Sequence, residues 1–421
     1  MEESIISENS LAATQQPAPA KRGSLFVNRN LGLLWFGESI SLLGDQFYMV
    51  ALPWLVLQLT GSALAVGTIL AVAGIPRALL MLVGGVFTDR MSPRLLMLLS
   101  NAARIIITGL LTALVMTQLI QVWMLYVLSF AFGVVDAFFH PAYMAILPMI
   151  VEEDKLASGN ATLQGTSLLV SGIGPGIGGV LVKLAGTGLS FFLDTLSFVV
   201  ATFSLLSMDT TKIKQAPAKK TSIVAEIREA VAYLAGDNLL RPMMLIIMAL
   251  NFLFIGPMMV GPAVLAKQRF VEQGSIALGF LLSSMGIGSL IGMLAGSMLK
   301  PSRLGIVTLS SFAIAGLGII GSGFTATLWL TAVLFAVVGT SYGFSNLLII
   351  TWLQQRISKE MMGRIMSIVM LSSTGLMPIS SALGGLLASY SLTLLFALNG
   401  SLLVLLVIVS LFNSYVRGMR A

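Results

Sequence analysis

The chain alternates between long apolar runs and short polar turns. The runs lie near residues 31–58, 62–88, 95–117, 121–147, 157–184, 188–208, 241–266, 276–299, 303–324, 327–354, 362–388 and 391–414. Each run is long enough for a helix that crosses the bilayer, whose hydrocarbon core takes about 20 apolar residues. A transmembrane β-barrel would instead need segments of about 10 residues with alternating polarity. The pattern therefore predicts twelve transmembrane helices, six on each side of a polar segment.

The composition supports a membrane protein with many spans. Hydrophobic residues make up 57% of the chain and charged residues only 10%, with a mean hydropathy of +0.96. Soluble domains are typically about 45–50% apolar and about 25% charged. The 42 glycines fit the same class, because small residues let membrane helices approach closely. We expect an all-α membrane protein built from two six-helix bundles.

Polar segments divide the chain into five parts. Helical spacing of Ile223, Ile227, Val231 and Leu234 predicts an amphipathic helix in the middle segment. The predicted parts are a disordered tail at 1–30, an N-terminal bundle at 31–208, a linker at 209–240, a C-terminal bundle at 241–414 and a short tail at 415–421. Two bundles of this kind enclose a cavity between them.

The basic residues indicate the orientation of the chain. If both tails and the linker lie on one side, the turns of the other side carry only Lys183, Lys267 and Arg269. Loops rich in Lys and Arg stay in the cytoplasm, so both termini and the linker are expected there. The expected location of the protein is the plasma membrane of a bacterium, that is, the cell membrane or the inner membrane. The formal net charge of +7 is thereby accounted for without a nucleic-acid partner.

Other function classes find no support in the residues. The chain has no cysteine and one histidine, which leaves no plausible zinc site. The glycine-containing run from Gly178 to Lys183 lacks the Gly-Lys-Ser/Thr ending of a phosphate-binding loop. We therefore expect no enzyme activity, no cofactor and no metal. The expected partners are a small-molecule substrate and the lipid bilayer.

The turn after the second run is a charged hinge between two long apolar runs. It contains Gly85, Asp89, Arg90 and Arg94. Asp89 ends a helix, where the helix dipole disfavours an anion, so it needs a positive partner. Arg90, Arg94 or the start of the eleventh run near Gly363 can supply one. An acid bound to the eleventh helix would act as a gate between the bundles; alternatively, the turn only sets the topology.

This turn resembles motif A of the major facilitator superfamily. The match consists of Gly85, three residues, Asp89 and Arg90, three residues, and Arg94, between the second and third helices. The equivalent turn of the second half, from Gly296 to Arg303, has no acid. The resemblance implies the major facilitator fold, transport by alternating access and a protein that acts as a monomer.

A second motif lies in the fifth run. Gly174, Pro175, Gly178 and Gly179 resemble the core of motif C, which is associated with the antiporters of this superfamily. Proline kinks a helix and glycines give it a smooth face for a close neighbour. The resemblance implies export. Alternatively, the motif makes a kinked, tightly packed helix and says nothing of the direction of transport.

Three further segments resemble the macrolide-efflux and siderophore-exporter branch. They are Val134–Ala142, Phe191–Phe198 and Gly363–Ser367. The resemblance implies a secondary active transporter for efflux of small amphipathic compounds, driven by protons. Two other functions stay open: a uniporter or importer of a nutrient or lipid-like solute, and a membrane receptor without transport.

Ionisable residues inside the runs are candidates for proton coupling, because charges are costly in a membrane. Glu38 and Asp45 are seven residues apart and share one helix face. Asp136 and His140 are four apart, so the acid can orient the imidazole. Arg104 is a fifth candidate. The alternatives are that Asp136 neutralises an arginine as a structural ion pair and that His140 is an ordinary core residue.

The resemblance also suggests which residues line the cavity. In this superfamily the first, fourth, seventh and tenth helices do so. The corresponding candidates are Asp45, Tyr48, Asp136, Phe138, Asn251, Phe254, Tyr342 and Asn346. Aromatic, amide and acidic groups suit amphipathic and cationic compounds. Alternatively, most of the aromatic and methionine side chains face lipid or pack in the core. Asp194 matches the pattern of the efflux branch; alternatively, since it lies six residues from the outer turn at Gly188, it caps a helix or lies at the membrane interface.

Overall fold

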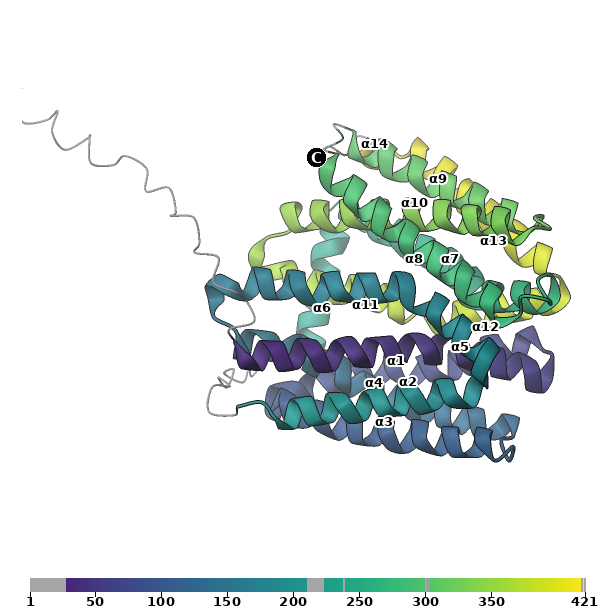
Figure 1. Cartoon of the computed structure of the whole chain (residues 1–421). Coiled ribbons are helices and arrows are strands. Elements are labelled where there is room, and N and C mark those ends of the chain that lie inside the picture. The colour runs from purple at the N-terminus through teal and green to yellow at the C-terminus, as the bar shows by residue number, and fades with distance from the viewer. Residues whose placement is uncertain are drawn as a thin grey trace, which may run out of the picture.

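The computed structural model describes residues 28–209, 223–237, 239–299, 301, 303–417 and 419, and these residues form helices and turns without a strand. Figure 1 shows the arrangement. The helices are α1 Arg29–Thr60, α2 Ala63–Arg90, α3 Pro93–Met116, α4 Val122–Ile150, a 3-10 turn Glu153–Lys155, α5 Leu156–Leu206, α6 Ile223–Gly236, α7 Leu240–Gln268, α8 Ser275–Met298, α9 Leu304–Ser322, α10 Leu328–Arg356, α11 Lys359–Thr374, α12 Met377–Tyr390, α13 Leu392–Phe412 and α14 Ser414–Arg417.

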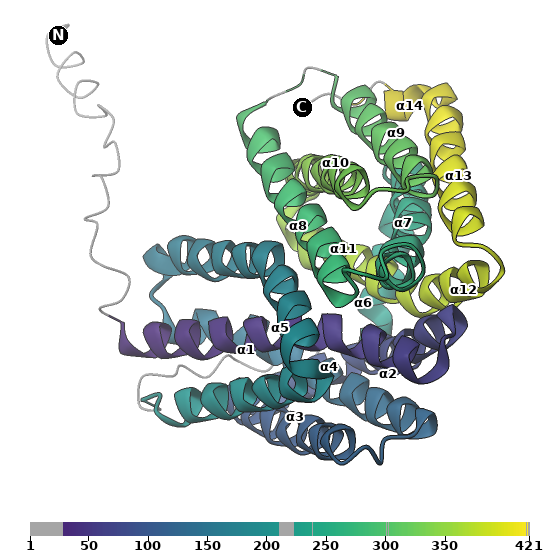
Figure 2. The same cartoon turned by 45° about the vertical axis from the view of Figure 1, so that its right-hand side comes forward.

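Ten of the described helices are long and apolar enough to cross a membrane. The predicted all-α membrane class is thus confirmed, while the number of twelve spans stays a prediction. Helix α5 holds 51 residues, far more than a bilayer needs, and Gly186 interrupts it with a φ of 80°. Only glycine adopts this backbone conformation readily. The break lies between the predicted fifth and sixth spans, and the chain turns back there (Figure 2).

The predicted eleventh span, 362–388, is not one continuous helix. Helix α11 ends at Thr374 and α12 begins at Met377, with Gly375 between them. Pro378 has no backbone N–H, so it cannot bond to the carbonyl of Thr374 in a continuous helix. Glycine adds low helix propensity at the same place. The two residues together explain the interruption, which the apolar run alone does not reveal.

The helices form two groups whose most extensive contacts are made by two helix pairs. Helices α1 to α5 pack on one another, as do α7 to α13. The groups meet where α5 contacts α8 and where α2 contacts α12. In Figure 2 the two groups converge near α5 and α12 and separate toward the side where α1 begins. Below, the end of the molecule where α1 begins and α13 ends is called the terminal end, and the other is called the far end.

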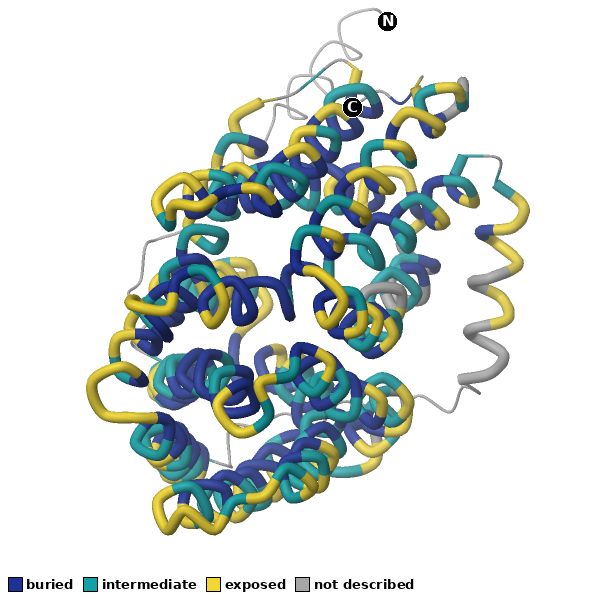
Figure 3. The backbone as a smooth tube through the Cα atoms, turned by 90° about the vertical axis from the view of Figure 1, so that its right-hand side faces the viewer, coloured by how far each residue is buried: buried dark blue, intermediate teal, exposed yellow. Residues whose placement is uncertain are grey.

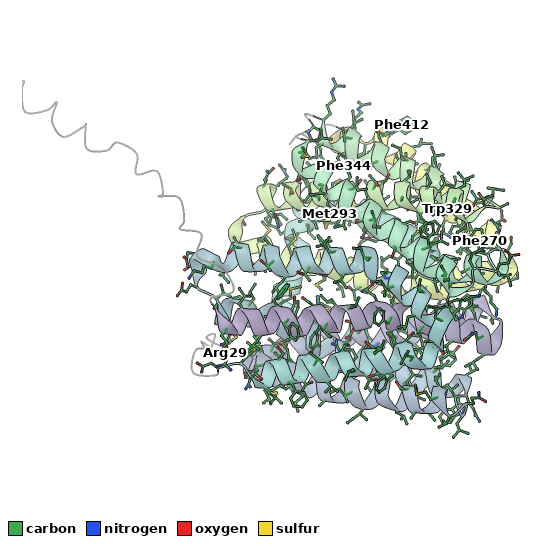
Figure 4. All side chains as sticks on the ribbon, viewed as in Figure 1. Arg29, Phe270, Met293, Trp329, Phe344 and Phe412 are labelled. Carbon is green, nitrogen blue, oxygen red and sulfur yellow. The ribbon has the colours of Figure 1, made fainter. Side chains whose placement is uncertain are left out.

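The burial pattern is that of a protein immersed in lipid. Buried residues lie between the helices and exposed ones on the outer surfaces (Figure 3). Many exposed side chains are large and apolar, which is the expected arrangement where the solvent is hydrocarbon. Trp329, at the start of α10, is 74% exposed, and Phe412, at the end of α13, is 83% exposed (Figure 4). Aromatic residues of this kind are enriched where a membrane meets water.

The linker contains a helix where the spacing predicts one. Helix α6 packs against α7 and α11. Leu234 is buried, whereas Arg228 and Glu229 are exposed. Residues 1–27 and 210–222, which include most of the predicted tail and the first part of the linker, lie outside the described residues.

Candidate functional site

Small residues allow α5 and α8 to pack closely against each other. A Cβ atom on Gly179 would lie 3.0 Å from the Cα of Gly279, so neither helix has room for a larger residue here. Ser275 Oγ donates to the carbonyl of Gly179 at 3.0 Å, and the backbone N–H of Gly176 donates to Ser283 Oγ at 2.7 Å. The predicted motif C therefore lies at the contact between the two helix groups.

The other glycines of motif C face α1. A Cβ atom on Gly174 would lie 2.8 Å from the Cβ of Gln46, and one on Gly178 would lie 3.4 Å from the Cα of Phe47. Pro175 stands between the two faces. The first segment of α5 is thus packed between α1 and α8, and its glycines allow close packing on both sides.

The second contact, between α2 and α12, is built in the same way. A Cβ atom on Gly67 would lie 2.8 Å from the Cα of Gly385, and Gly74 packs against Pro378. Gly67 and Gly179 both lie toward the far end of the molecule. The two helix groups are therefore joined at the far end.

A central cavity of about 490 Å³ lies between the groups. It reaches from Pro53 in α1 to Asn160 and Gln164 at the start of α5, so it extends toward the terminal end. Its ionisable lining residues include Glu38, Asp45, Arg77, Arg104, Asp136 and His140. All of them come from α1 to α4, and α7, α8, α11 and α12 contribute apolar and hydroxyl groups such as Met259 and Thr374.

Asp136 neutralises two arginines. Its carboxylate oxygens bind Arg104 on α3 and, at 3.2 Å, Arg77 on α2. Arg104 is 4% exposed, and its guanidinium carbon lies 3.9 Å from the centre of the Phe139 ring. The ion pair and the aromatic face together offset the cost of burying this charge. The structural ion pair that the sequence offered as the alternative for Asp136 is present.

Glu38 and Asp45 have no such partner. Neither carboxylate forms an ion pair or a hydrogen bond with any described residue, although both line the cavity. Glu38 is 5% exposed. Both lie on α1, one above the other, as their spacing predicts. Among the described residues, the cavity thus holds one acid bound to two arginines and two acids that form no ion pair.

His140 also lines the cavity but does not bind Asp136. No hydrogen bond of the imidazole with a described residue is found, and the Asp136 oxygens are occupied by the two arginines. The predicted orientation of His140 by Asp136 is therefore not seen in this state. Both side chains lie on one face of α4, as predicted.

On α1 and α4, the aromatic lining of the central cavity differs from the predicted one at Phe138. Tyr48 lines the cavity as predicted and stacks on Phe132 with the ring centres 5.1 Å apart. Phe138 does not line the cavity; its ring meets that of Phe87 on α2 at 5.6 Å. Phe139, the next residue along α4, faces the cavity instead. Phe132 and Phe139 were not among the predicted residues.

The predicted lining residues of the second half lie around a separate cavity. Asn251, Tyr342 and Asn346 line a space of about 340 Å³ together with apolar residues of α7, α9, α10 and α11. Their side-chain polar groups form no hydrogen bond with described residues. Phe254 does not line this space; it stacks on Tyr342 with the ring centres 4.5 Å apart and is 4% exposed.

Motif A lies at the terminal end of α2 and the start of α3. Arg94 donates from Nε to the carbonyl of Leu205 at 2.8 Å and from Nη2 to that of Leu206 at 3.0 Å. It thereby caps the end of α5, where cations are favoured. Arg90 is exposed. The side chain of Asp89, on which the predicted gate rests, lies outside the described residues, as does that of Arg364.

The close contact in this region is made by Gly84 and not by Gly85. A Cβ atom on Gly84 would lie 3.1 Å from the carbonyl carbon of Ala137 on α4, whereas Gly85 has open space around it. The sequence pattern pointed to Gly85 because it belongs to the motif. The packing requirement at its neighbour follows from the rotation of α2 against α4.

Comparison with known families agrees with this architecture. A family model described as Major Facilitator Superfamily matches residues 34–381. The chain belongs to this superfamily. The major facilitator architecture accounts for the two helix groups with a polar cavity between them.

Relatives of this major facilitator include exporters. Macrolide efflux protein A of Streptococcus pyogenes is 23% identical over 385 residues, covering 89% of this chain and 94% of the relative. Multidrug efflux pump Tap of Mycolicibacterium fortuitum is 26% identical over 339 residues, covering 77% of this chain and 79% of the relative. The resemblance to an efflux branch is thus confirmed.

A solved structure supports the fold. A bacterial homologue of the iron transporter ferroportin, in an inward-facing state, superposes with a TM-score of 0.65 and 20% sequence identity. The alignment covers 92% of this chain and 99% of that one. The helix arrangement is therefore that of a known membrane transporter.

Proposed function

We propose that this protein is a proton-coupled exporter of small amphipathic compounds that works by alternating access. The observation that carries the proposal is the pair of unpartnered acids, Glu38 and Asp45, in a cavity between two helix groups. An acid without a counter-ion in a membrane protein gains or loses a proton more readily than one held by arginine. Proton binding at these acids can therefore compete with binding of the substrate.

The arrangement of the contacts supports alternating access. The groups are joined at the far end by the glycine contacts of α5 with α8 and α2 with α12, and the cavity extends toward the terminal end. With both termini in the cytoplasm, as the basic turns predict, this is an inward-facing state. We place the protein in the bacterial plasma membrane as a functional monomer with bundles at 31–208 and 241–414.

The lining favours cationic, amphipathic substrates. Tyr48, Phe132 and Phe139 offer flat apolar faces, while Glu38 and Asp45 offer carboxyl groups that form no ion pair with a described residue. Aromatic rings also attract cations through their faces. The two efflux relatives act on macrolides and on multiple drugs, as their names state, which agrees with a cavity that accepts varied shapes.

The test is transport by purified protein in sealed vesicles with an imposed pH gradient. Accumulation of a cationic dye and of a macrolide is measured together with proton flux, for the wild type and for Asp45→Asn and Glu38→Gln. Asp154→Asn is the matched control, because Asp154 is an exposed acid between α4 and α5. We expect either cavity variant to reduce proton-driven transport at least tenfold and the control to leave it unchanged.

Other results would reject parts of this proposal. Equal transport by both cavity variants, with no response to the pH gradient, would exclude proton coupling through α1. Accumulation in the direction opposite to export would assign the protein as an importer. Binding of the dye without any flux would instead indicate a receptor.

A further inference from the structure

The structure contains a third acid that the proposed mechanism does not use. Asp194 lies on the second segment of α5 and is 0% exposed. Neither of its carboxylate oxygens has a hydrogen-bond partner among the described residues. A helix cap or an interfacial position, as expected from the nearby turn, would leave it bonded or hydrated. It is neither, so another explanation for an acid at this position is needed.

Asp194 is packed against α1 at the residue before Asp45. A Cβ atom on Gly44 would lie 2.8 Å from Asp194 Oδ1, so only glycine leaves room for the carboxyl group here. Ser197 donates to the backbone carbonyl of Asp194 at 2.7 Å and does not bind its carboxyl group. Phe191 and Phe198, one turn away on either side, are both 0% exposed. The carboxyl group is therefore enclosed without a hydrogen-bond partner among the described residues.

The titratable groups that interact with Asp194 do not compensate for its ionisation. They are Asp45 and Tyr48 on α1, Arg104 on α3 and Asp136 on α4. Asp45 carries the same charge, and Arg104 is already bound to Asp136. An isolated carboxylate in an apolar environment costs far more than a neutral carboxyl group, so such groups keep their proton.

We propose that Asp194 is a second proton-binding site, which forms a carboxyl pair with Asp45 across Gly44. Asp45 is partly exposed and lines the cavity, whereas Asp194 does not line it. A negative charge on either carboxyl group opposes ionisation of the other. The two groups then release their protons in two steps that belong to the pair. The role in transport rests on the proposed proton coupling, but proton binding itself does not.

Infrared spectra of the full-length protein in lipid, recorded over a series of buffers from acid to alkaline pH, test the proposal. A protonated carboxyl group has a carbonyl stretch separate from the carboxylate bands. We expect a protonated-carboxyl band that persists to alkaline pH in the wild type and is lost in Asp194→Asn. The band should remain in Asp154→Asn, which removes an exposed acid. An unchanged band in Asp194→Asn would overturn the assignment.

A second variant keeps the proposal testable if Asp194→Asn folds poorly. Asp45→Asn removes the neighbouring negative charge, so the carboxylate form of Asp194 becomes less unfavourable. The Asp194 band should then disappear at a lower pH than in the wild type. A band with the same pH midpoint in Asp45→Asn would show that the two acids do not form a pair.

The outcome is separable from the proposed function, because the spectra require neither substrate nor flux. If Asp194 binds a proton but Asp45→Asn transports normally, the pair exists and does not drive transport. If transport is proton-driven but the Asp194 band is absent, coupling uses α1 alone, and the present inference is wrong. For transport, we expect Asp194→Asn to change the pH profile of flux while leaving dye affinity within about twofold of the wild type.

Discussion

Gly176 on α5 donates its backbone N–H to Ser283 Oγ on α8 at 2.7 Å, across the contact between the two helix groups. The preceding Pro175 cannot continue the regular helical bonding, since it has no N–H and its ring displaces the carbonyl four residues earlier. Ser283 also lies 3.4 Å from the carbonyl of Ile173, to which it donates. One serine thus bonds to the kinked part of motif C from the opposite group.

Ser283→Ala is therefore expected to weaken the closed far end. Loss of the acceptor leaves a buried N–H unsatisfied, at a cost of about 1–3 kcal/mol in the state seen here. The equilibrium should shift toward a state in which the far end is open. The chain has no cysteine, so spin labels at introduced Cys residues, replacing Leu119 and Phe324, report on the far end alone.

Ser284→Ala is the matched control for this variant. Ser284 donates to Phe280 within its own helix at 2.8 Å and takes no part in the contact with α5. Its label distances should equal those of the parent. If Ser283→Ala also leaves the distances unchanged, motif C does not hold the far end closed through this bond.

Asp136→Asn is expected to destabilise the fold much more than Asp45→Asn. Asp136 neutralises Arg104, which is 4% exposed, so the amide would leave a buried cation without a counter-ion. Removing one partner of a buried ion pair typically costs about 3–5 kcal/mol. Asp45 has no such partner among the described residues. Thermal unfolding in detergent compares the two variants directly.

A double variant distinguishes this explanation from a general intolerance at position 136. Asp136→Asn combined with Arg104→Gln removes the charge and its counter-ion together. It should be more stable than Asp136→Asn alone, because the fully buried cation, Arg104, is gone and only the half-exposed Arg77 loses its partner. Additive losses in the double variant would contradict a stabilising ion pair.

The helices could be predicted well from the sequence, because in lipid a single backbone segment can satisfy its N–H and C=O groups only as a helix. Unpaired backbone groups are too costly in hydrocarbon, so a long apolar run becomes a helix. The predicted run 95–117 and the observed α3, Pro93–Met116, differ by two residues at most. The interruption at Gly375 escaped prediction because it depends on Pro378, whose ring packs 2.9 Å from the position of a Cβ on Gly74 of the other group.

The candidate site could be predicted only in part, because a lining position depends on how each helix is rotated. Asp45, Asp136 and Tyr48 line the cavity as predicted. The prediction that Phe138 lines the cavity is wrong. Successive residues of a helix are rotated by about 100°, so Phe139 faces the cavity instead. The full burial of Asp194 was not predicted for a similar reason. Its distance along the chain from a turn did not reveal that α1 covers it.

Asp237, in the linker, is expected to make the attachment of α6 to the C-terminal helices sensitive to pH. Partial burial opposes ionisation, but the N–H groups of Leu240 and Leu239 and the guanidinium of Arg356 outweigh it and lower the pKa of Asp237. A lowered pKa in the folded state stabilises the fold above the unfolded value of about 3.9, and this contribution is lost as the pH falls through the folded value. Hydrogen exchange at Leu239 and Leu240 measures it.

Two substitutions separate the charge of Asp237 from its helix cap. Asp237→Asn keeps an oxygen that accepts from the backbone and loses only the ion pair with Arg356, which is 3.3 Å long and exposed to solvent. Such surface pairs contribute about 0–1 kcal/mol. Asp237→Ala also loses the cap, at about 1 kcal/mol. Exchange at Leu240 should therefore rise only slightly in Asp237→Asn and clearly in Asp237→Ala; equal rates in both would mean that the cap is unimportant.

Arg94→Ala is expected to destabilise the protein without changing the affinity for substrate. The guanidinium binds the carbonyls of Leu205 and Leu206 at the end of α5 and so connects that end to the start of α3. Hydrogen bonds to charged groups contribute about 1.5–3 kcal/mol, and thermal unfolding should show a loss of this size. Arg90→Ala, at an exposed position, is the control and should change stability by less than about 0.5 kcal/mol.

The same variant bears on the gate proposed for motif A. If Arg94 bonds only to α5, Asp89→Asn should slow the conformational cycle, while Arg94→Ala should leave its rate near that of the parent. The effects of the two substitutions on the rate should then add in the double variant. If Arg94 is instead the partner of Asp89, each single variant should slow the cycle equally and the double variant no further. Label distances followed over time after a pH jump distinguish the two results. Because two N–H groups of Arg94 already donate to carbonyls of α5, we expect the effects on the rate to add.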